Sequence, residues 1–317
     1  MTSSSEMGED MMKTAVITGS TGMIASALIR LLVDKGVKVY ALCKPGEPRN
    51  DDFFKSPLVT AIDADISELP AVADKINEKC DVLYHFAWLG TFGGVRDDAY
   101  LQSDNIRYTL DAVTLASKLS CECFIGAGSQ AEYGPVGEKL TAKTPASPVN
   151  GYGIAKLAAG NLSRLYAQNL GIRHIWARIL SVYGQKGNPN AIIPSSIIKM
   201  MHGEHCPFTA GEQDWDFMHC DDIAIAFYMM GEKGKDGAVY PLGTGSTRKL
   251  RDYMLEMRDI INPNAEIGIG ELPYNKDQVM YLCADISELT ADTGFTSQIS
   301  FEEGIKRTYE WLKSEGY

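Results

Sequence analysis

The sequence has no run of 18 apolar residues, which a membrane-spanning helix would need, and no signal peptide at its start. It also has no basic run or patch. Its formal net charge is -11 at pH 7, and its isoelectric point lies near 5.0. This charge argues against binding along the phosphates of nucleic acid. We therefore expect a cytoplasmic protein with neither a membrane nor a nucleic-acid partner.

Metal-ligand patterns are missing as well. The seven cysteines are odd in number and lack the spacing of metal ligands, which indicates reduced thiols and no metal site. We find no internal repeat, and residues 1–11 form the only biased segment, a polar stretch that we predict to be a disordered tail. The 317 residues suffice for one large or two unequal domains.

The head of the chain carries a glycine-rich turn. Residues 14–25 read T-A-V-I-T-G-S-T-G-M-I-A, an apolar run followed by two glycines and the start of an amphipathic stretch. Gly19 permits a tight turn, Gly22 lets a phosphate approach the backbone, and Ala25 lets the helix lie close to the sheet. Such a turn often binds nothing, so this segment alone leaves dinucleotide binding open.

Strand and helix patterns alternate after this turn. A helical apolar stripe is formed by Ile24, Ala27, Leu28, Leu31 and Leu32. Gly36 ends this helix, and a buried strand follows over residues 37–43. Further strands are predicted over 58–62, 81–87, 121–127 and 173–180, and helices over 99–118 and 151–170. The alternation predicts an α/β fold with a doubly wound parallel sheet of the Rossmann type.

After about residue 184 the sequence pattern changes, and proline and glycine interrupt the segments more often. We predict a dinucleotide-binding domain over residues 12–183 with a return segment near 217–243. A smaller substrate-binding region would comprise residues 184–216 and 244–317 and lie over the strand ends, where ligands bind in open α/β sheets.

A second chemical signal is Tyr152 and Lys156, four residues apart on a predicted helix and therefore on one face. A lysine ammonium near a phenol favours the phenolate and makes the tyrosine a usable proton donor and acceptor. The same tyrosine–lysine spacing occurs twice elsewhere in the chain, so context must decide. Here the pair follows a loop at a helix start, and Ser129 ends a strand upstream.

Motifs over nearly the whole chain then combine into one pattern. They are T-G-S-T-G-M-I-A at 18–25, D-A-D-I at 63–66, H-F-A-W at 85–88, Asn105 in a helix, G-S-Q-A-E-Y-G at 128–134, Y-G-I-A-K at 152–156, R-I-L-S-V-Y-G at 178–184, W-D-F-M-H-C-D-D at 215–222 and L-G-T-G-S at 242–246. In this order they resemble the extended short-chain dehydrogenase/reductases, the NAD(P)-dependent nucleotide-sugar epimerase, dehydratase and ketoreductase group.

The resemblance implies a role for each matching position. Tyr152 would be the general acid/base, Lys156 would hold the nicotinamide ribose and tune Tyr152, Ser129 would hydrogen-bond the reacting sugar oxygen, and Asn105 would complete the catalytic set. Cofactor contacts would come from Gly19, Thr21, Gly22, Met23, Ile24, Lys44, Arg49, Asp65, Ile66, Phe86, Ala87, Trp88, Tyr152 and Lys156, with Asp65 on the adenine. Substrate contacts would come from Ser129, Gln130, Ser181 and Lys276. Relatives also form a homodimer through the helices expected at 99–118 and 151–170.

Each role has a structural alternative. Ser129 could merely cap a strand end, and Asn105 could be a polar residue on a helix face. His85 and His219 are expected to be structural, because their motifs lie beside the sheet. His219, followed by two aspartates, is typical of a helix start.

Departures from the family pattern narrow the chemistry. Family dehydratases carry an Asp-Glu pair directly after the residue equivalent to Ser129, but this chain has Gln130 and Ala131 there. Glu132 stands one place too late, so a 4,6-dehydratase is disfavoured, although a shifted loop could still bring Glu132 into the pocket. At the substrate end, Trp215 replaces a common arginine and Ser181 a common asparagine. Lys276 stands near the place of another arginine, where it would bind the pyrophosphate as a single charge without the two parallel hydrogen bonds of an arginine. The alternative is a solvated surface lysine.

The choice of cofactor depends on the end of the second strand. NAD enzymes usually have an acid there for the ribose hydroxyls, whereas this chain has Cys43 followed by Lys44 and Arg49. Cations without an acid suit a 2′-phosphate, so NADP is favoured, with NAD possible and a solvated basic loop as the alternative.

These observations predict an NADP-dependent oxidoreductase acting on a nucleotide-linked sugar, with 4-keto-6-deoxyhexose reduction as the first expectation. The alternative is an NAD(P)-dependent nucleotide-sugar 4-epimerase, which uses the same residues. A second alternative is a cofactor-sensing protein without catalysis, which the presence of both Tyr152 and Lys156 disfavours. We expect a nucleotide-sugar substrate and a homodimer.

Overall fold

The structure is a computed structural model that describes residues 11–275 and 278–317. The predicted tail lies outside the described residues except for Met11, and Lys276 lies outside them too. None of the described helices is both long and apolar enough to cross a membrane.

A seven-stranded sheet forms the centre of the molecule, in the order β11-β6-β5-β4-β1-β2-β3. Every neighbouring pair of its strands is parallel, as the alternation of strands and helices predicted. The strands are β1 Thr14–Thr18, β2 Lys38–Cys43, β3 Val59–Asp63, β4 Val82–His85, β5 Cys123–Ser129, β6 Arg173–Ile179 and β11 Val239–Leu242. All five residues of β1 are buried, because helices cover both faces of the sheet.

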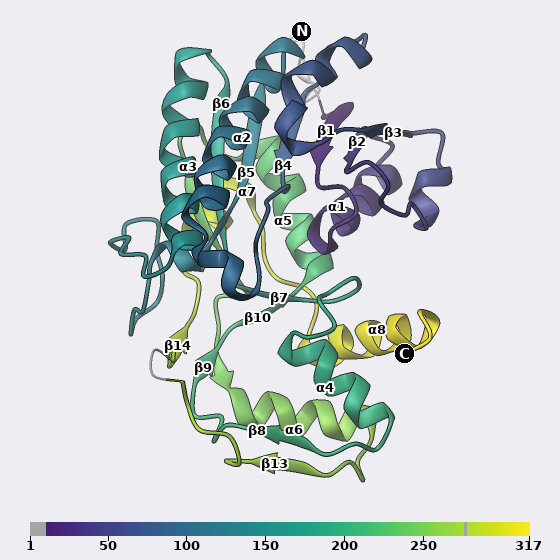
Figure 1. The fold of residues 1–317 in the computed structure, drawn as a ribbon, viewed down its shortest axis with the longest axis vertical. Helices are drawn as coiled ribbons and strands as arrows, with labels where there is room; N and C mark the ends of the chain where they lie inside the picture. Colours follow the sequence, from purple (N-terminus) through teal and green to yellow (C-terminus); the bar gives the residue numbers. More distant parts are fainter. Residues whose placement is uncertain (1–10, 276–277) are drawn as a thin grey trace, which may run out of the picture.

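Helices α1 (Met23–Asp34) and α5 (Cys220–Lys233) pack together on one face of the sheet, and α2 (Ala99–Lys118) and α3 (Gly151–Asn169) cover the other (Figure 1). Each face has its own apolar core. Short 3₁₀ helices complete the connections: η1 Asp52–Lys55, η2 Ile66–Lys75, η3 Gly93–Asp97 and η4 Gln130–Glu132. The segment 217–243 returns to the sheet by adding α5 and the edge strand β11.

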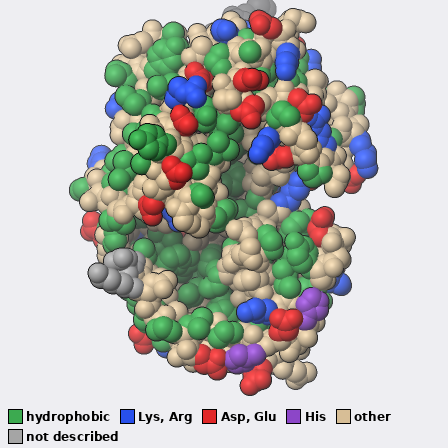
Figure 2. Space-filling model, in the orientation of Figure 1, with side chains coloured by type: hydrophobic (Ala, Val, Ile, Leu, Met, Phe, Trp, Pro, Cys, Tyr) green, Lys and Arg blue, Asp and Glu red, His purple; other side chains and the backbone are tan. Residues whose placement is uncertain are grey.

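The C-terminal part lies beyond the sheet, at the bottom of Figure 1, with a core of its own. Strand β7 (Ser181–Tyr183) leads into it and pairs with β10 (Phe217–His219). Its other elements are α4 Ile192–Met201, β8 Cys206–Phe208, β9 Asp214–Trp215, β12 Arg248–Lys249, α6 Leu250–Ile261, β13 Ile267–Ile269, β14 Tyr281–Leu282 and α8 Phe301–Ser314, while α7 (Ser287–Thr293) packs against α5. Figure 2 shows the molecule hollowed between this part and the sheet, with hydrophobic side chains in the hollow.

Two strands differ from their predicted bounds for local reasons: β5 is shifted by two residues, and β4 is shorter than predicted. The strand expected from residue 121 begins at Cys123, because the Cys121 amide bonds to the end of α2. The strand expected to reach residue 87 ends at His85, because the amides of Phe86 and Ala87 both donate to the Thr18 hydroxyl.

Candidate active site

The glycine-rich turn between β1 and α1 is held close to the end of β4. Gly19 has a φ of +67°, and a Cβ there would lie 2.9 Å from the amide nitrogen of Ala87. The Thr18 hydroxyl, which accepts from Ala87 at 3.1 Å, ties the same two segments together. Gly19 is therefore required both for the turn and for this close approach.

The start of α1 is suited to a phosphate. Gly22 is its N-cap, with no side-chain cap, so the first amides, including those of Met23 and Ile24, keep their hydrogen-bonding capacity for a ligand. The Thr21 side chain turns away and donates to Glu47. These residues fit the pyrophosphate of a dinucleotide.

Ser129 and Tyr152 are brought together by a close contact between two chain segments. Ser129 ends β5 and caps η4, with its hydroxyl accepting from Ala131. Asn150 caps α3 by accepting from the amide of Gly153, and a Cβ at Gly153 would lie 2.4 Å from the Ala131 carbonyl oxygen. Because a glycine stands there, the start of α3 reaches η4 and Tyr152 faces Ser129.

Lys156 lies below this pair and is only 4% exposed. Its Nζ donates to the Ala127 carbonyl at 2.6 Å and stands 3.6 Å from the ring centroid of Trp88. Burial lowers the pKa of Lys156 to about 7, against an upward contribution from Glu132. The distance from Nζ to the ring centroid of Tyr152 is 5.8 Å.

Tyr152 lies between two side chains of the segment after β4. The Trp88 ring meets its ring edge to face at 6.1 Å, and the guanidinium carbon of Arg96 stands 4.7 Å from its centroid. Burial raises the pKa of Tyr152, whereas a hydrogen bond with Ser129 and the charge of Arg96 lower it. Sequence reasoning missed Arg96, because it lies outside every motif that we recognised.

Asn105 is fully buried and holds a loop. Its Oδ1 accepts from the Leu89 amide and its Nδ2 donates to the Leu89 carbonyl, both at 2.9 Å. Gln102 accepts from the indole nitrogen of Trp88 at 3.0 Å, so α2 fixes this loop at two points. Asn105 therefore acts on the site through the loop that carries Trp88, and direct participation in catalysis stays a prediction.

Glu132 is fully buried, and both of its carboxylate oxygens have partners within the protein. Its Oε1 accepts from the Ser129 amide at 2.8 Å and from the Trp176 indole at 2.9 Å. Its Oε2 forms an ion pair with Arg178 at 2.7 Å. These three donors engage both carboxylate oxygens, so Glu132 is held by partners within the protein.

The expected adenosine end of the site carries charges of both signs. Arg49 forms an ion pair with Asp63, so only part of its charge is left for a 2′-phosphate. Asp65 caps η2, and its hydrogen bonds with Ser67, with a smaller contribution from Lys44, lower its pKa. Two other expected cofactor residues are packed against the cores: Phe86 against Phe227 and Ile66 against the α2 face.

The expected substrate end is a cavity of about 340 Å³ between α4, β8 and α6. Ser181 lines it and accepts a hydrogen bond from the Trp215 indole at 2.7 Å. Ser129 pairs in the sheet with Ile179, two residues before Ser181, so the cavity adjoins the catalytic edge. Gln130 is half-buried at the start of η4, while Lys276 lies outside the described residues.

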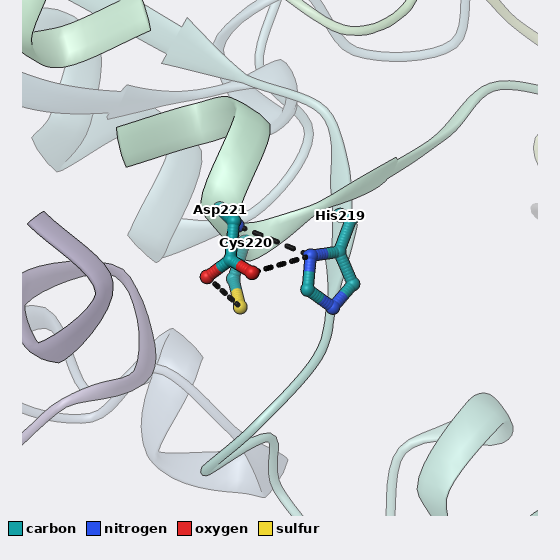
Figure 3. A group of neighbouring side chains, drawn as sticks. All are labelled: His219, Cys220 and Asp221. Carbon is teal, nitrogen blue, oxygen red and sulfur yellow. Dashed lines mark hydrogen bonds and ion pairs between the residues drawn. The ribbon is translucent and has the colours of Figure 1, made fainter. Parts of the chain in front are cut away.

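His219, Cys220 and Asp221 bring three possible metal ligands within 4.8 Å of one another (Figure 3). Protein partners engage Nδ1 of His219 and both oxygens of Asp221, whereas the buried Nε2 of His219 has no hydrogen-bond partner among the described residues. His219 caps α5, as its position before two aspartates predicted, and accepts from the Asp221 amide. The Asp221 carboxylate forms ion pairs with Arg30 and Arg307.

A doubly wound sheet with a glycine-rich phosphate turn, and with Ser129 and Tyr152 at its carboxyl edge beside the buried Lys156, defines a dinucleotide-dependent enzyme of the short-chain dehydrogenase/reductase type. The chain belongs to the NAD dependent epimerase/dehydratase family, whose model matches residues 15–243. This agrees with the family resemblance of its motifs.

Curated relatives include both dehydratases and epimerases. The trifunctional UDP-glucose 4,6-dehydratase/UDP-4-keto-6-deoxy-D-glucose 3,5-epimerase/UDP-4-keto-L-rhamnose-reductase of Arabidopsis thaliana is 28% identical over 94% of the chain. The chain spans only 47% of that relative's length. A putative UDP-glucose 4-epimerase of Methanocaldococcus jannaschii is 27% identical, with 94% of this chain and 98% of the relative covered.

Solved structures of two epimerases share the fold. UDP-N-acetylglucosamine 4-epimerase from Methanobrevibacter ruminantium superposes with a TM-score of 0.86 at 22% identity, covering 96% of this chain and 99% of its own. UDP-glucuronic acid 4-epimerase from Bacillus cereus, solved with NAD, gives 0.82 at 21% identity, covering 96% and 100%. At these identities the likeness concerns the fold.

Proposed function

We propose that the protein is a nucleotide-sugar 4-epimerase. The observation that carries this proposal is the combination of Ser129, Tyr152 and Lys156 at one edge with Glu132 locked in an ion pair below it. This set can remove and return a proton at a sugar hydroxyl but offers no acid and base for eliminating water. The epimerases among the similar proteins also support a 4-epimerase.

In this mechanism Tyr152 takes the proton from the C4 hydroxyl, and Ser129 donates a hydrogen bond to the same oxygen as it becomes a carbonyl. A nicotinamide dinucleotide, when bound, would accept and return the hydride. Lys156 would hold its ribose and add positive charge beside Tyr152. After the keto sugar has rotated to present its other face, Tyr152 returns the proton to the C4 oxygen. The reaction therefore consumes no cofactor.

The cavity beside Ser181 is the proposed place of the nucleotide. Its lining is largely apolar, with Phe208 and Trp215 as flat surfaces for a base. Lys199 and Arg251 also line it and are the cations that we assign to the diphosphate. The expected contact of Lys276 with the pyrophosphate stays part of the proposal.

A reductase that uses NADPH is the second candidate, and one observation favours it. The second strand ends at Cys43 with Lys44 and Arg49 beside it, an arrangement that suits a 2′-phosphate. A reductase must exchange its cofactor in every cycle, whereas an epimerase retains it. The preference for NADP over NAD, expected from the sequence, therefore bears directly on which reaction is catalysed.

The decisive experiment identifies the retained cofactor and the product. Purified protein is denatured, the released dinucleotide is identified by mass, and fresh protein is incubated with UDP-linked hexoses, hexosamines and hexuronic acids without added cofactor. An epimerase gives the 4-epimer under these conditions, and Tyr152→Phe lowers its rate by about 10²–10⁴ with little change in binding. Turnover of 4-keto sugars only with added NADPH would establish the reductase instead. Absence of both would leave the cofactor-sensing alternative.

A further inference from the structure

We propose that Arg96 is a positioning residue for the reaction: a permanent cation held on the ring of Tyr152 that stabilises its phenolate form. This inference rests on the proposed function only in making Tyr152 the proton acceptor. The geometry that carries it is the stacking of the guanidinium on the tyrosine ring, with 4.7 Å between the guanidinium carbon and the centroid.

The backbone fixes Arg96 in this place. The neighbouring Asp97 accepts a hydrogen bond from the Gly151 amide at 2.8 Å, which joins η3 to the first turn of α3. A Cβ at Gly151 would lie 2.9 Å from the Arg96 carbonyl oxygen, so only glycine permits the approach without a shift. Since Gly151 directly precedes Tyr152, this junction sets Arg96 over the phenol ring.

The charge of Arg96 is not cancelled by an acid. Among residues 11–275 and 278–317, Arg96 makes no ion pair, and its buried Nε has no hydrogen-bond partner. The Asp97 carboxylate is engaged by the Gly151 amide, while Glu132, beneath the site, is paired with Arg178. A cation over a ring face is attracted to it, and more strongly once the phenol has lost its proton.

Lys156 cannot serve this purpose equally at all pH values. Its Nζ is directed to the Ala127 carbonyl and to Trp88, and burial lowers its pKa to about 7. An arginine keeps its charge throughout the range in which enzymes work. Arg96 therefore supplies the constant part of the field on Tyr152, and Lys156 supplies a part that falls as the pH rises through 7.

The test compares Arg96→Met and Arg96→Lys in the cofactor-loaded protein. A control is Arg107→Met, because Arg107 stacks on Tyr108 at 4.6 Å on the outside of α2. Phenolate formation is followed by ultraviolet absorbance, using the difference from the same variants carrying Tyr152→Phe. We expect Arg96→Met to raise the titration midpoint of Tyr152 by about one pH unit, Arg96→Lys to raise it less, and the control not to move it.

The same variants are measured as pH profiles of kcat/KM for epimerisation. The acid limb should shift upward in Arg96→Met by the amount seen in the titration, because the phenolate is the form that accepts the proton. An unchanged midpoint, or a rise in KM without a shift in either profile, would overturn the proposal and make Arg96 a structural or substrate-binding residue. If the parent catalyses no epimerisation, the absorbance titration still decides the role of Arg96.

Discussion

The buried ion pair of Glu132 and Arg178 offers the sharpest test of whether Glu132 belongs to the catalytic chemistry. Glu132 is fully buried and the side chain of Arg178 is 9% exposed. Glu132 accepts hydrogen bonds from the Ser129 amide, the Trp176 indole and Arg178 at 2.7–2.9 Å. Glu132→Ala should therefore lower the free energy of unfolding by about 3–5 kcal/mol, since it leaves an uncompensated buried guanidinium.

The control is the double variant Glu132→Gln, Arg178→Met, which removes both charges, keeps the volume and leaves an amide oxygen to accept from the Ser129 amide and the Trp176 indole. We expect it to unfold with a free energy within about 1–2 kcal/mol of the parent, because a buried ion pair is often replaceable by neutral side chains of similar volume when the remaining donors keep an acceptor. Urea unfolding at pH 7, followed by circular dichroism, gives both values. If the double variant is folded but loses more than about 10² in turnover, Glu132 takes part in the chemistry and the reasoning fails.

Three further predictions concern the cofactor, the interface and the buried lysine. In calorimetric titration, Lys44→Ala should weaken the binding of NADPH by about 1–3 kcal/mol and leave the binding of NADH nearly unchanged. Arg49→Ala should have a smaller effect, because Arg49 is already paired with Asp63. Equal losses of affinity for the two cofactors would count against NADP selectivity. Leu162→Glu should convert the expected dimer to monomer in analytical ultracentrifugation, since Leu162 is 46% exposed on the outer face of α3; an unchanged mass would place the interface elsewhere. Because burial lowers the pKa of Lys156 from 10.5 to about 7, the unfolded state binds more protons than the folded state between pH 7 and 10.5, and the free energy of unfolding should rise with pH over this range. Lys156→Met should reduce this dependence on pH. An unaltered dependence would contradict the assigned burial of Lys156.

The sheet and its main helices could be predicted from the sequence because their signals are local. The helices expected at 99–118 and 151–170 occur as α2 Ala99–Lys118 and α3 Gly151–Asn169, both with polar caps at the expected starts. Among the strands predicted by residue range, the errors lie at the ends, while β11 and α5 were anticipated only as part of a return segment. The Thr18 hydroxyl, which captures the amides of Phe86 and Ala87, is such a case, and no periodicity reveals it.

The C-terminal part was predicted only as a region, without its elements. Its strands are two or three residues long and pair across large distances in sequence, as β9 does with both β12 and β14. Runs of this length show no alternation that distinguishes a strand from a loop. The cavity that we assign to the nucleotide is built by these elements, so neither its place nor its cations Lys199 and Arg251 followed from the sequence.

Arg96 and Glu132 show why the chemistry of the site depends on side-chain direction as well as on order along the chain. Glu132 follows Ser129 by three residues, one place too late for the acid pair of the dehydratases, and its carboxylate is held by the Trp176 indole and Arg178. Arg96 precedes Tyr152 by 56 positions and had no motif to mark it, yet the contact between η3 and Gly151 sets it on the phenol ring. In the function that we propose, Glu132 is withheld from the substrate and Arg96 acts on the phenol from a distant part of the chain. Both placements would favour proton transfer by Tyr152 over elimination of water, and this is why the proposal is an epimerase and not a dehydratase.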